Sequence, residues 1–333
     1  MSARCLPYSN GNVSSWDQLE SVWDHSFEEC LHVDTASANV FLTETHLPSK
    51  SNRETMMETM FELFTVAGLY IHPAPALALY ASGSFSGCVV DLGHLSTTVF
   101  PVAQGYQLAS SCIKTQHGGH HLSQLFLSSL YARDIIAGDN YYRTLLSSQR
   151  GRTPLDVARY LKENHVFVDE SFQPTPLLAP SGIPDREYPL PDGTKIRVGA
   201  ELVRCGEAMF RPLMDNDLFD LGDERPLQNI VMESIQHCSM ELRKPLLSNI
   251  VLTGGTSHVP GLQERLLKEL KQIVPPSISG AVNVISAPGG DAAIWKGASI
   301  LADLSTFQDQ YVTLAEYQEN GASCVHEFCP VYL

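Results

Sequence analysis

Cys88-Val-Val-Asp91-Leu-Gly93 is an apolar run that ends in Asp-x-Gly, and a second apolar run follows from Ser96 to Val102. The pattern predicts two strands joined by a tight turn, with a further turn at Gln104-Gly105. An Asp-x-Gly turn at a strand end exposes backbone N–H groups and a carboxylate, which together can hold a phosphate and its metal ion. Most such turns only close hairpins, so the motif needs support from elsewhere in the chain.

Support comes from Gly254-Gly255-Thr256, which follows the apolar strand pattern of Asn249 to Thr253 and precedes a helix pattern near Pro260. A glycine-rich turn from strand to helix presents N–H groups and the positive end of the helix dipole to an anion. Tight packing would also explain the two glycines. Lys162-Glu163, on a predicted helix, could contact a base or ribose, or could lie on a solvated helix face. The sequence leaves both pairs of alternatives open.

Length and composition indicate a globular protein with an ample core. The chain has 333 residues and a net charge of −15, with its lysines and arginines scattered. This charge makes nucleic acid and anionic membranes poor direct partners. The eight cysteines include no CxxC pair, no stretch resembles a signal peptide, and no apolar run reaches the roughly 18 residues of a membrane span. We therefore expect an intracellular, reduced protein.

Strand and helix patterns alternate along the chain, which predicts an α/β fold with ligand-binding loops at strand ends. Two capping boxes, Ser15 to Gln18 and Ser51 to Glu54, predict helix starts, and the second helix should end at Gly68. Its Met57, Met60, Phe61 and Phe64 are interpreted as core. Further strands are expected at 39–43, 69–72, 188–191, 195–198 and 282–285, and further helices at 75–80, 119–130, 154–168, 224–241, 260–273 and 293–304.

Two clusters could suggest metal binding. His117, His120 and His121 surround a Gly-Gly turn, but adjacent histidines do not easily share one ion and no cysteine or carboxylate spacing completes a site. Cys324 to Cys329 also lacks a second ligand pair. We predict no metal site, and the sequence contains no Gly-x-Ser-x-Gly, Walker loop or His-Glu-x-x-His motif.

The order of these pieces resembles actin and the actin-related proteins over about nine tenths of the chain. The last two matches are the most specific. The matching runs are Ser15 to Phe27, Leu42 to Glu44, Asn52 to Glu62, Leu79 to Gly83, Gly105-Tyr106, Leu190 to Gly193, Val251 to Gly261 and Trp295 to Phe307. The resemblance implies an α/β, actin-like (ribonuclease H-like, two-lobed) fold. It also implies an N-terminal truncation, in which the first phosphate hairpin and the small outer subdomain are absent.

The resemblance implies four parts. They are a lead-in at 1–14, the remainder of the first lobe at 15–81 plus 293–333, an inner subdomain of the second lobe at 82–117 plus 225–292, and its outer subdomain at 118–224. The outer subdomain would carry a patternless surface insertion near 131–152.

The departures from the family indicate that ATP hydrolysis is lost. Asp91 and Gly93 keep the family pattern, whereas His94 and Leu95 replace an Asp and a Gly. Thr98 replaces the His that helps position the attacking water, and Ala74 stands in place of the catalytic Gln. Without these groups the γ-phosphate and the water are not oriented, so we expect no catalytic residue and no enzyme activity.

The base side of the family's nucleotide site is better kept. The matching positions are Asp91, Gly93, Gly119, Lys162, Glu163, Gly254, Gly255 and Thr256, which we interpret as a vestigial site. Asp291 departs, because it reverses the charge of a Lys near the adenine. We expect no cofactor, with residual ATP or ADP binding as the alternative.

Partner binding is better preserved than catalysis. The family's groove for partner helices keeps its lining at Tyr80, Gly83, Gly105, Ile300, Leu301, Leu304 and Thr306, although Lys296 introduces a charge. We therefore expect a non-catalytic structural or partner-binding component of a cytoskeletal assembly. Its partners would be actin-binding or cytoskeletal-complex proteins, in the cytoplasm. The alternatives are a nucleotide-binding actin-family ATPase and a nuclear chromatin-remodelling subunit of the actin-related type.

Overall fold

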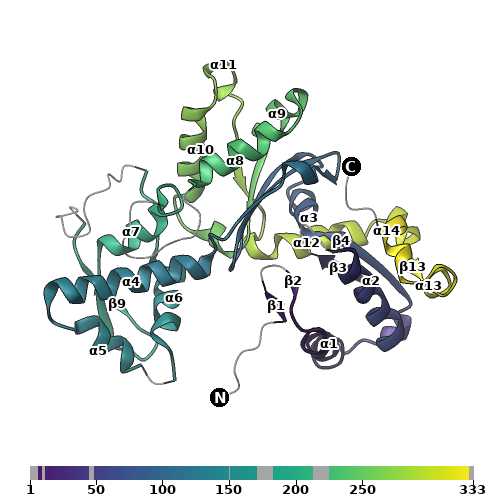
Figure 1. Cartoon of the computed structure of the whole chain (residues 1–333), viewed down its shortest axis with the longest axis horizontal. Coiled ribbons are helices and arrows are strands. Elements are labelled where there is room, and N and C mark those ends of the chain that lie inside the picture. The colour runs from purple at the N-terminus through teal and green to yellow at the C-terminus, as the bar shows by residue number, and fades with distance from the viewer. Residues whose placement is uncertain are drawn as a thin grey trace. The chain divides into compact units, whose positions relative to one another are not determined.

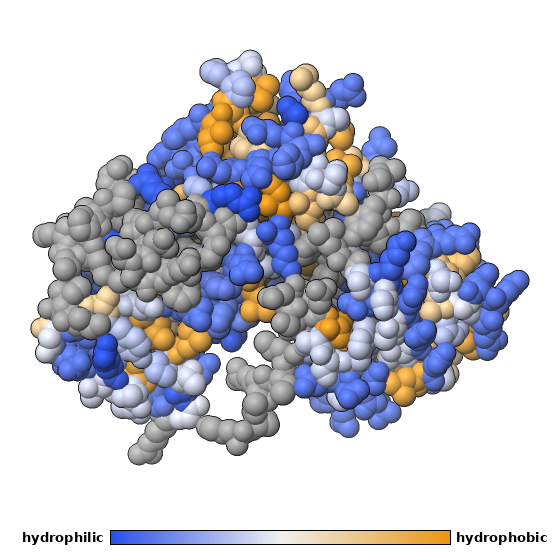
Figure 2. Space-filling view, viewed as in Figure 1, coloured by the Kyte–Doolittle hydropathy of each residue, from blue (hydrophilic) through white to orange (hydrophobic). Residues whose placement is uncertain are grey.

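The structure is a computed structural model that describes residues 7–9, 12–44, 49–149, 151–170, 183–212 and 225–329 (Figure 1). The chain forms two compact units. Unit 1 comprises residues 1–85, 103–109 and 293–333, and unit 2 comprises residues 86–102 and 110–292. The finer division into four parts stays a prediction. Hydrophilic residues cover much of the face seen in the space-filling view, with apolar patches between them (Figure 2).

Unit 1 is built on a three-stranded sheet in the order β13-β4-β3. The first two strands in the sequence, β3 (Asn39–Glu44) and β4 (Gly68–Pro73), run parallel, and β13 (Val312–Thr313) runs antiparallel to β4. The short strands are β1 (Tyr8–Ser9), β2 (Asn12–Val13) and β7 (Tyr106–Gln107). The helices are α1 (Trp16–His25), α2 (Lys50–Glu58), α3 (Ala74–Ala81), α12 (Ala293–Ala302), α13 (Leu314–Asn320) and α14 (Val325–Phe328).

Two of these helices continue into π-helical turns, which the sequence did not predict. α1 passes into η1 (Ser26–Leu31), and α2 passes into η3 (Thr59–Leu63). A π turn advances more residues per turn than an α-helix, so it shifts which side chains face the core. Phe64, directly after η3, packs edge-on against Trp23 and Phe27 with ring centroids 6.4 and 5.3 Å apart. The core interpretation of Met57, Met60, Phe61 and Phe64 is confirmed, since all four are buried.

The predicted helix ends need correction. Ser15 is the N-cap residue of α1, but its side chain accepts no capping hydrogen bond. The second helix begins two residues earlier than expected, because Ser49 accepts a bond from the Asn52 N–H at 3.0 Å and starts α2 at Lys50. It also ends at Leu63, before Gly68, which instead begins β4. Ser49 and Ser51 are both good N-cap residues, and the sequence alone does not decide which of them begins the helix.

α3 and α12 cross at a glycine. A Cβ on Gly297 would lie 1.8 Å from the carbonyl oxygen of Leu77, so only glycine permits this approach of the two backbones. Leu77 is fully buried. This contact joins α3 to α12, two segments of unit 1 that lie far apart in the sequence.

A buried ion pair ties the end of the described chain to the sheet of unit 1. Arg53 Nε donates to Glu44 Oε2 at 3.0 Å, and Arg53 Nη2 donates to the Cys329 carbonyl at 2.7 Å. Both side chains are almost completely buried. Glu44 Oε1 has no hydrogen-bond partner within the described chain. Burial, only partly offset by Arg53, raises the pKa of Glu44 to about 7.

Unit 2 is built on a mixed sheet in which β12, β11, β5 and β6 are neighbours in that order and β8 pairs with β6. β11 runs parallel to both β5 and β12, while β6 runs antiparallel to both β5 and β8. The strands are β5 (Gly87–Leu92), β6 (Thr97–Ala103), β8 (Ile113–Thr115), β11 (Ile250–Thr253) and β12 (Val284–Ser286), with a separate hairpin of β9 (Arg186–Pro189) and β10 (Lys195–Val198).

Helices flank these strands in unit 2 (Figure 1). They are α4 (Gly119–Ala137), α5 (Tyr141–Ser147), α6 (Pro154–His165), α7 (Ala200–Glu207), α8 (Leu227–His237), α9 (Met240–Leu247), α10 (Leu262–Ile273) and α11 (Pro276–Ser279). α7 was not predicted. In the described part of the chain, no helix is long and apolar enough to cross a membrane.

The stretch at 131–152 differs from the expected patternless insertion. Its first seven residues complete α4, and α5 follows after a turn that contains Gly138 in the left-handed region. Asp134 accepts hydrogen bonds from the Tyr142 and Arg143 N–H groups, at 2.9 and 2.8 Å, and so caps α5 from the preceding helix. Tyr142 and Leu146 are buried. A short helix capped from a distance carries little periodic signal, which is why the sequence pattern missed it.

A second buried ion pair stabilises unit 2. Arg265 on α10 donates to both carboxylate oxygens of Glu207 on α7, at 2.7 and 2.9 Å, and its Nε donates to Glu269 at 2.7 Å. The guanidinium also lies 5.1 Å from the centre of the Phe210 ring. Both carboxylate oxygens of Glu207 therefore accept hydrogen bonds from the guanidinium, whereas one oxygen of Glu44 has no partner in the described chain.

The unpartnered oxygen of Glu44 predicts a pH-dependent stability. Its folded pKa of about 7 lies above the usual 4.5, so its contribution is fully present below pH 4.5 and is lost as the pH rises through 7. Relative to Glu44→Gln, the wild-type protein should lose roughly 3 kcal/mol of unfolding free energy between pH 4.5 and 8. Urea unfolding followed by tryptophan fluorescence at several pH values measures this difference. Glu319→Gln, an exposed position on α13 of the same unit, is the control, and equal pH slopes for both variants would contradict the prediction.

Candidate functional site

The predicted turn motifs meet at one edge of the sheet in unit 2. β5 and β11 run parallel in a register that places Asp91 beside Thr253, so Asp91-Leu-Gly93 and Gly254-Gly255-Thr256 leave the sheet together. Asp91 also faces Thr98 across the β5–β6 pair. Burial raises the pKa of the Asp91 carboxyl to about 6. The strand-end geometry expected from the sequence is therefore present.

The two glycines of the second motif have different roles. A Cβ on Gly254 would lie 2.6 Å from Asp91 Oδ1 and 2.6 Å from the Leu92 carbonyl oxygen, and Gly254 has φ +84° and ψ 163°. This backbone conformation is restricted to glycine. A Cβ on Gly255 would meet no atom of the described chain within 4 Å, so packing does not require a glycine there. Tight packing thus explains Gly254 and leaves Gly255 unexplained.

A pocket of about 650 Å³ lies beside these turns. Six of the eight predicted nucleotide positions line it, namely Gly93, Gly119, Lys162, Glu163, Gly255 and Thr256. Asp91 and Gly254 are not among its lining residues, although each is next to a turn that lines it. The pocket is also lined by His94, Arg159, Asn164, Val166, His258, Val259, Pro260 and Asp291.

Lys162 is turned into the protein. Its Nζ donates to the Gly119 carbonyl oxygen at 2.6 Å, and burial lowers the pKa of its ammonium group. A Cβ on Gly119 would lie 2.9 Å from this nitrogen and 3.0 Å from Thr256 Oγ1, so a larger residue there would displace the Lys162 or Thr256 side chain. The solvated-face interpretation is therefore wrong for Lys162, which is buried, and it holds for Glu163, which is exposed.

The N–H groups at the start of α4 are already used within the chain. The Gly119 N–H donates to the Gly93 carbonyl at 2.9 Å, and the His120 N–H donates to the His94 carbonyl at 2.8 Å. The Gly118 N–H lies 3.4 Å from His121 Nδ1, and the Gly93 N–H closes its own turn onto Ser96. A free helix start is a ready anion site. Here the carbonyl oxygens of the hairpin turn after β5 accept the hydrogen bonds that an anion would accept.

The remaining charges in the lining are paired or neutralised. Arg159 Nε donates to Glu163 Oε1 at 2.9 Å, one helical turn away on α6. Burial, followed by the nearby His120, Arg159 and Lys162, lowers the pKa of His94 and favours its neutral form. His258 Nε2 lies 3.7 Å from Asp291 Oδ1. The sequence patterns did not single out Arg159 and His258, although the four-residue spacing to Glu163 and the position after the Gly-Gly turn were available signals.

The pocket has the size of a small-molecule site. The volume lies within the range of about 300–1,000 Å³ that is usual for small-molecule pockets, and Gly255 leaves one wall open. Several groups in the lining that could meet a phosphate already have partners within the chain. The lysine and arginine of the lining are engaged within the chain, and its N–H donors at the start of α4 are taken. Of the two departures from the family's catalytic pattern, Thr98 is 2% exposed within β6 of unit 2, and Ala74 begins α3 in unit 1.

The histidines near the Gly-Gly turn lie close together without forming a metal site. The His94 and His120 rings are 5.4 Å apart and those of His120 and His121 are 5.7 Å apart. Across the residues that the structure describes, no group of three or more His, Cys, Asp or Glu side chains could hold a metal ion.

The predicted partner-groove residues all belong to unit 1. They lie on or just after α3 and α12, except for Gly105, which lies in the turn between β6 and β7. Ile300 and Leu304 are exposed, at 51% and 48%. Phe85 and Tyr106, which lie next to Gly83 and Gly105 in the sequence, are exposed as well. Tyr80 packs its ring 5.4 Å from that of Phe85. Gly105 has φ +87°, which favours glycine, and a Cβ there would lie 2.8 Å from Tyr80 Oη. Gly83 and Thr306 are exposed and Leu301 is half-buried.

These observations define an α/β protein of two units, each with a sheet flanked by helices, whose strand-end turns gather around a pocket. A family model for actin matches residues 4–330, and the chain belongs to the actin family. The fold expected from the sequence is confirmed at this level. The truncation, the nucleotide contacts and the partner groove stay predictions.

The different roles of the two glycines can be tested directly. Gly254→Ala should destabilise unit 2 by about 1–3 kcal/mol or more, because the new methyl group would meet Asp91 and the backbone in a glycine-only conformation. Gly255→Ala should change stability by less than about 0.5 kcal/mol. Thermal unfolding of the two variants, side by side, measures the contrast. Equal losses would show that the register between β5 and β11 does not constrain Gly254.

Proposed function

We propose that this chain is a non-catalytic member of the actin family that works by binding protein partners, as a structural component of a cytoskeletal assembly. It neither hydrolyses ATP nor depends on bound nucleotide. The observation that carries this proposal is the internal use of the pocket's cationic and N–H groups, above all Lys162 with Gly119 and the start of α4 with the hairpin turn. Phosphoryl transfer requires free cationic and N–H groups that face the phosphate. Groups already bonded within the chain would first have to break these bonds.

The loss of catalysis is supported by the residues that would orient water. Thr98 is buried within β6 and pairs with Asp91 in the strand register, so its hydroxyl is no substitute for an imidazole that reaches the pocket. Ala74 begins α3 with no amide group. Neither position supplies a group that can accept a proton or hold a water for attack on phosphorus.

The partner-binding role is supported by exposed apolar surface on unit 1. Ile300 and Leu304 lie one turn apart on and just after α12, and about half of each side chain is exposed. Large apolar side chains exposed together on a folded unit indicate an interaction surface. In the actin family, which this chain resembles at these positions, the corresponding surface receives amphipathic partner helices. We therefore assign the same role to Tyr80, Gly83, Gly105, Ile300, Leu301, Leu304 and Thr306.

Nucleotide dependence is tested by thermal unfolding of the full chain with ATP and magnesium, ADP and magnesium, or adenosine. A ligand at 100 times its dissociation constant adds about 2.7 kcal/mol, enough to move the midpoint by several degrees. We expect no magnesium-dependent shift at millimolar ATP and no release of phosphate. A shift with ATP that exceeds the shift with adenosine and disappears with EDTA would instead favour the nucleotide-binding ATPase.

Partner binding is tested with a labelled, near-neutral amphipathic helical peptide whose apolar residues follow i, i+3, i+4 and i+7 spacing. Fluorescence anisotropy should detect binding to the wild-type chain. Ile300→Asp with Leu304→Asp should weaken it at least about tenfold, because both charges would be desolvated at the contact. The control is Met240→Asp, at an 80% exposed position in unit 2, which should leave binding unchanged. No binding by the wild-type chain, or equal loss in the control, would contradict the proposed surface.

A further inference from the structure

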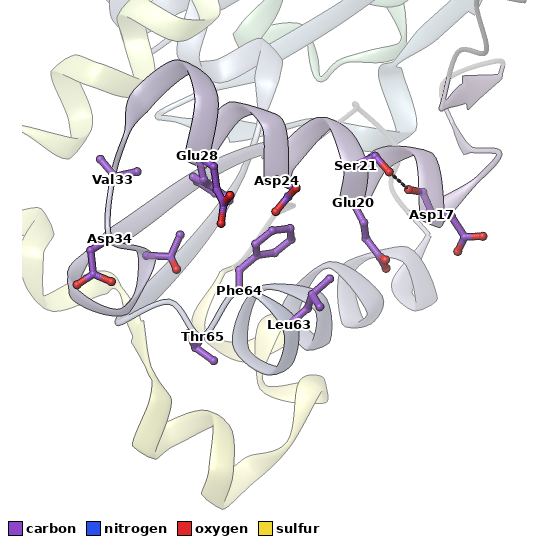
Figure 3. A pocket seen from close by; sticks show the side chains of 12 residues that line it. Asp17, Glu20, Ser21, Asp24, Glu28, Val33, Asp34, Leu63, Phe64 and Thr65 are labelled. Atoms are coloured by element: carbon purple, nitrogen blue, oxygen red, sulfur yellow. Dashed lines mark hydrogen bonds between the residues drawn. The ribbon is translucent and has the colours of Figure 1, made fainter. Parts of the chain in front are cut away.

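A second pocket lies entirely within unit 1 and has no part in the function proposed above. Its volume is also about 650 Å³. α1 forms one wall, the turn after η1 closes one end, and the last residues of η3 with Thr65 form the other wall (Figure 3). We call it the acidic groove. Its lining residues are Asp17, Glu20, Ser21, Asp24, Phe27, Glu28, Val33, Asp34, Thr35, Leu63, Phe64 and Thr65.

The rim of the acidic groove carries five carboxylates and, among its described lining residues, no lysine or arginine. Glu20, Asp24 and Glu28 follow each other at four-residue spacing along α1 and η1, on the side that faces Phe64 (Figure 3). In the described chain none of the three forms an ion pair. The wider sequence has the same bias, because no lysine or arginine occurs between Arg4 and Lys50. The negative potential of this wall therefore has no nearby compensating side chain along the chain.

The floor of the acidic groove is apolar. Phe27 and Phe64 form its buried base, with rings 5.3 Å apart. Leu63 and Val33 lie above them at the two sides, and 57% and 43% of these residues remain exposed. Leu63 ends η3, where the π-helical turn brings it to the surface rather than to the core. An exposed leucine and valine over two phenylalanines make an apolar contact area inside a charged rim.

We propose that the acidic groove binds a basic amphipathic helix of a protein partner. The apolar face of that helix would cover Leu63, Val33 and Phe64, and its lysines or arginines would face Glu20, Asp24 and Glu28. A basic ligand is favoured because its charge would complement that of the rim. A row of carboxylates with no cation among them attracts a cationic segment and repels an acidic one. The apolar floor then adds the contact energy that exposed charges alone do not supply.

The spacing of the carboxylates fits a helix. Residues four apart on a helix are separated by about 6 Å along the axis, so the three carboxylates span about 12 Å. Basic residues one turn apart on a partner helix repeat at the same distance. A free polyamine or a metal ion would use the rim but not Leu63 and Val33. Nucleic acid and anionic lipid would be repelled by the rim.

The experiment uses a synthetic 18-residue peptide with leucines at i, i+3, i+4 and i+7 spacing and lysines one turn apart beside them. Two peptides serve as comparisons, one with glutamate in place of lysine and one with serine in place of leucine. The protein is the full chain with Trp295→Phe, which leaves Trp16 and Trp23, both on α1, as the tryptophans that report binding. Trp23 packs against Phe64 and should respond to occupation of the groove.

The variants separate the rim from the floor. Glu20→Gln, Asp24→Asn and Glu28→Gln together should weaken peptide binding at least about tenfold and reduce its salt dependence. The control carries the same charge change elsewhere on unit 1, as Asp309→Asn, Glu319→Gln and Glu327→Gln, all exposed. Leu63→Ser should weaken binding severalfold, whereas Leu31→Ser, at a 62% exposed leucine outside the lining, should not.

Selective binding of the lysine–leucine peptide, lost in the rim variant and retained in its control, supports the proposal. Three results overturn it: no binding by the wild-type chain, equal weakening in the rim variant and its control, or equal binding of the serine peptide, which would reduce the effect to general attraction between charges. The groove lies apart from Ile300 and Leu304 in the sequence and its probe is strongly basic. Failure here therefore leaves the near-neutral peptide test above intact.

Discussion

The parallel pairing of β5 with β11 is the constraint on which the pocket of unit 2 depends. Its register puts Thr253 beside Asp91, and Gly254 can then leave the sheet only by passing within van der Waals contact of the Asp91 carboxylate. The other parts of the pocket lining are positioned by contacts that begin at this edge of the sheet. The hairpin turn after Asp91 meets the start of α4, and α4 in turn meets α6 through Gly119 and Lys162. The pocket is thus a by-product of how the strands end.

This dependence explains what the sequence could and could not predict. The Asp-x-Gly and Gly-Gly-Thr turns are local signals, and parallel strands place their ends at one edge, so Gly93, Gly255 and Thr256 line one pocket. Gly119, Lys162 and Glu163 lie on helices outside these turns, and the family resemblance assigned them to the same site. The orientation of Lys162 was not predictable in the same way. A lysine next to a glutamate on a helix has the same local pattern whether its ammonium enters solvent or caps a distant carbonyl, and only the tertiary position of Gly119 decides.

The elements of unit 1 show a similar limit. Hydrophobic periodicity correctly placed the core stripe of α2 and η3, because burial follows period over a few turns. It could not place the change from α to π winding at Ser26 and at Thr59, since a π turn inserts a phase shift without any residue that marks it. The same shift brings Leu63 to the surface. The acidic groove is therefore a consequence of winding as well as of composition.

Buried charge is paired in both units, but unit 1 also carries a row of unpaired carboxylates at its described surface. In unit 2, Arg265 with Glu207 and Lys162 with Gly119 pair buried charge with matching groups, so little charge is left for a ligand. In unit 1, Glu20, Asp24 and Glu28 share one exposed face with no opposing cation in the described chain. Exposed like charges on one helix face repel each other and reduce helix stability by a few tenths of a kcal/mol per pair. A cationic partner would remove that repulsion, so the arrangement that weakens the isolated helix is also the one that favours a bound state.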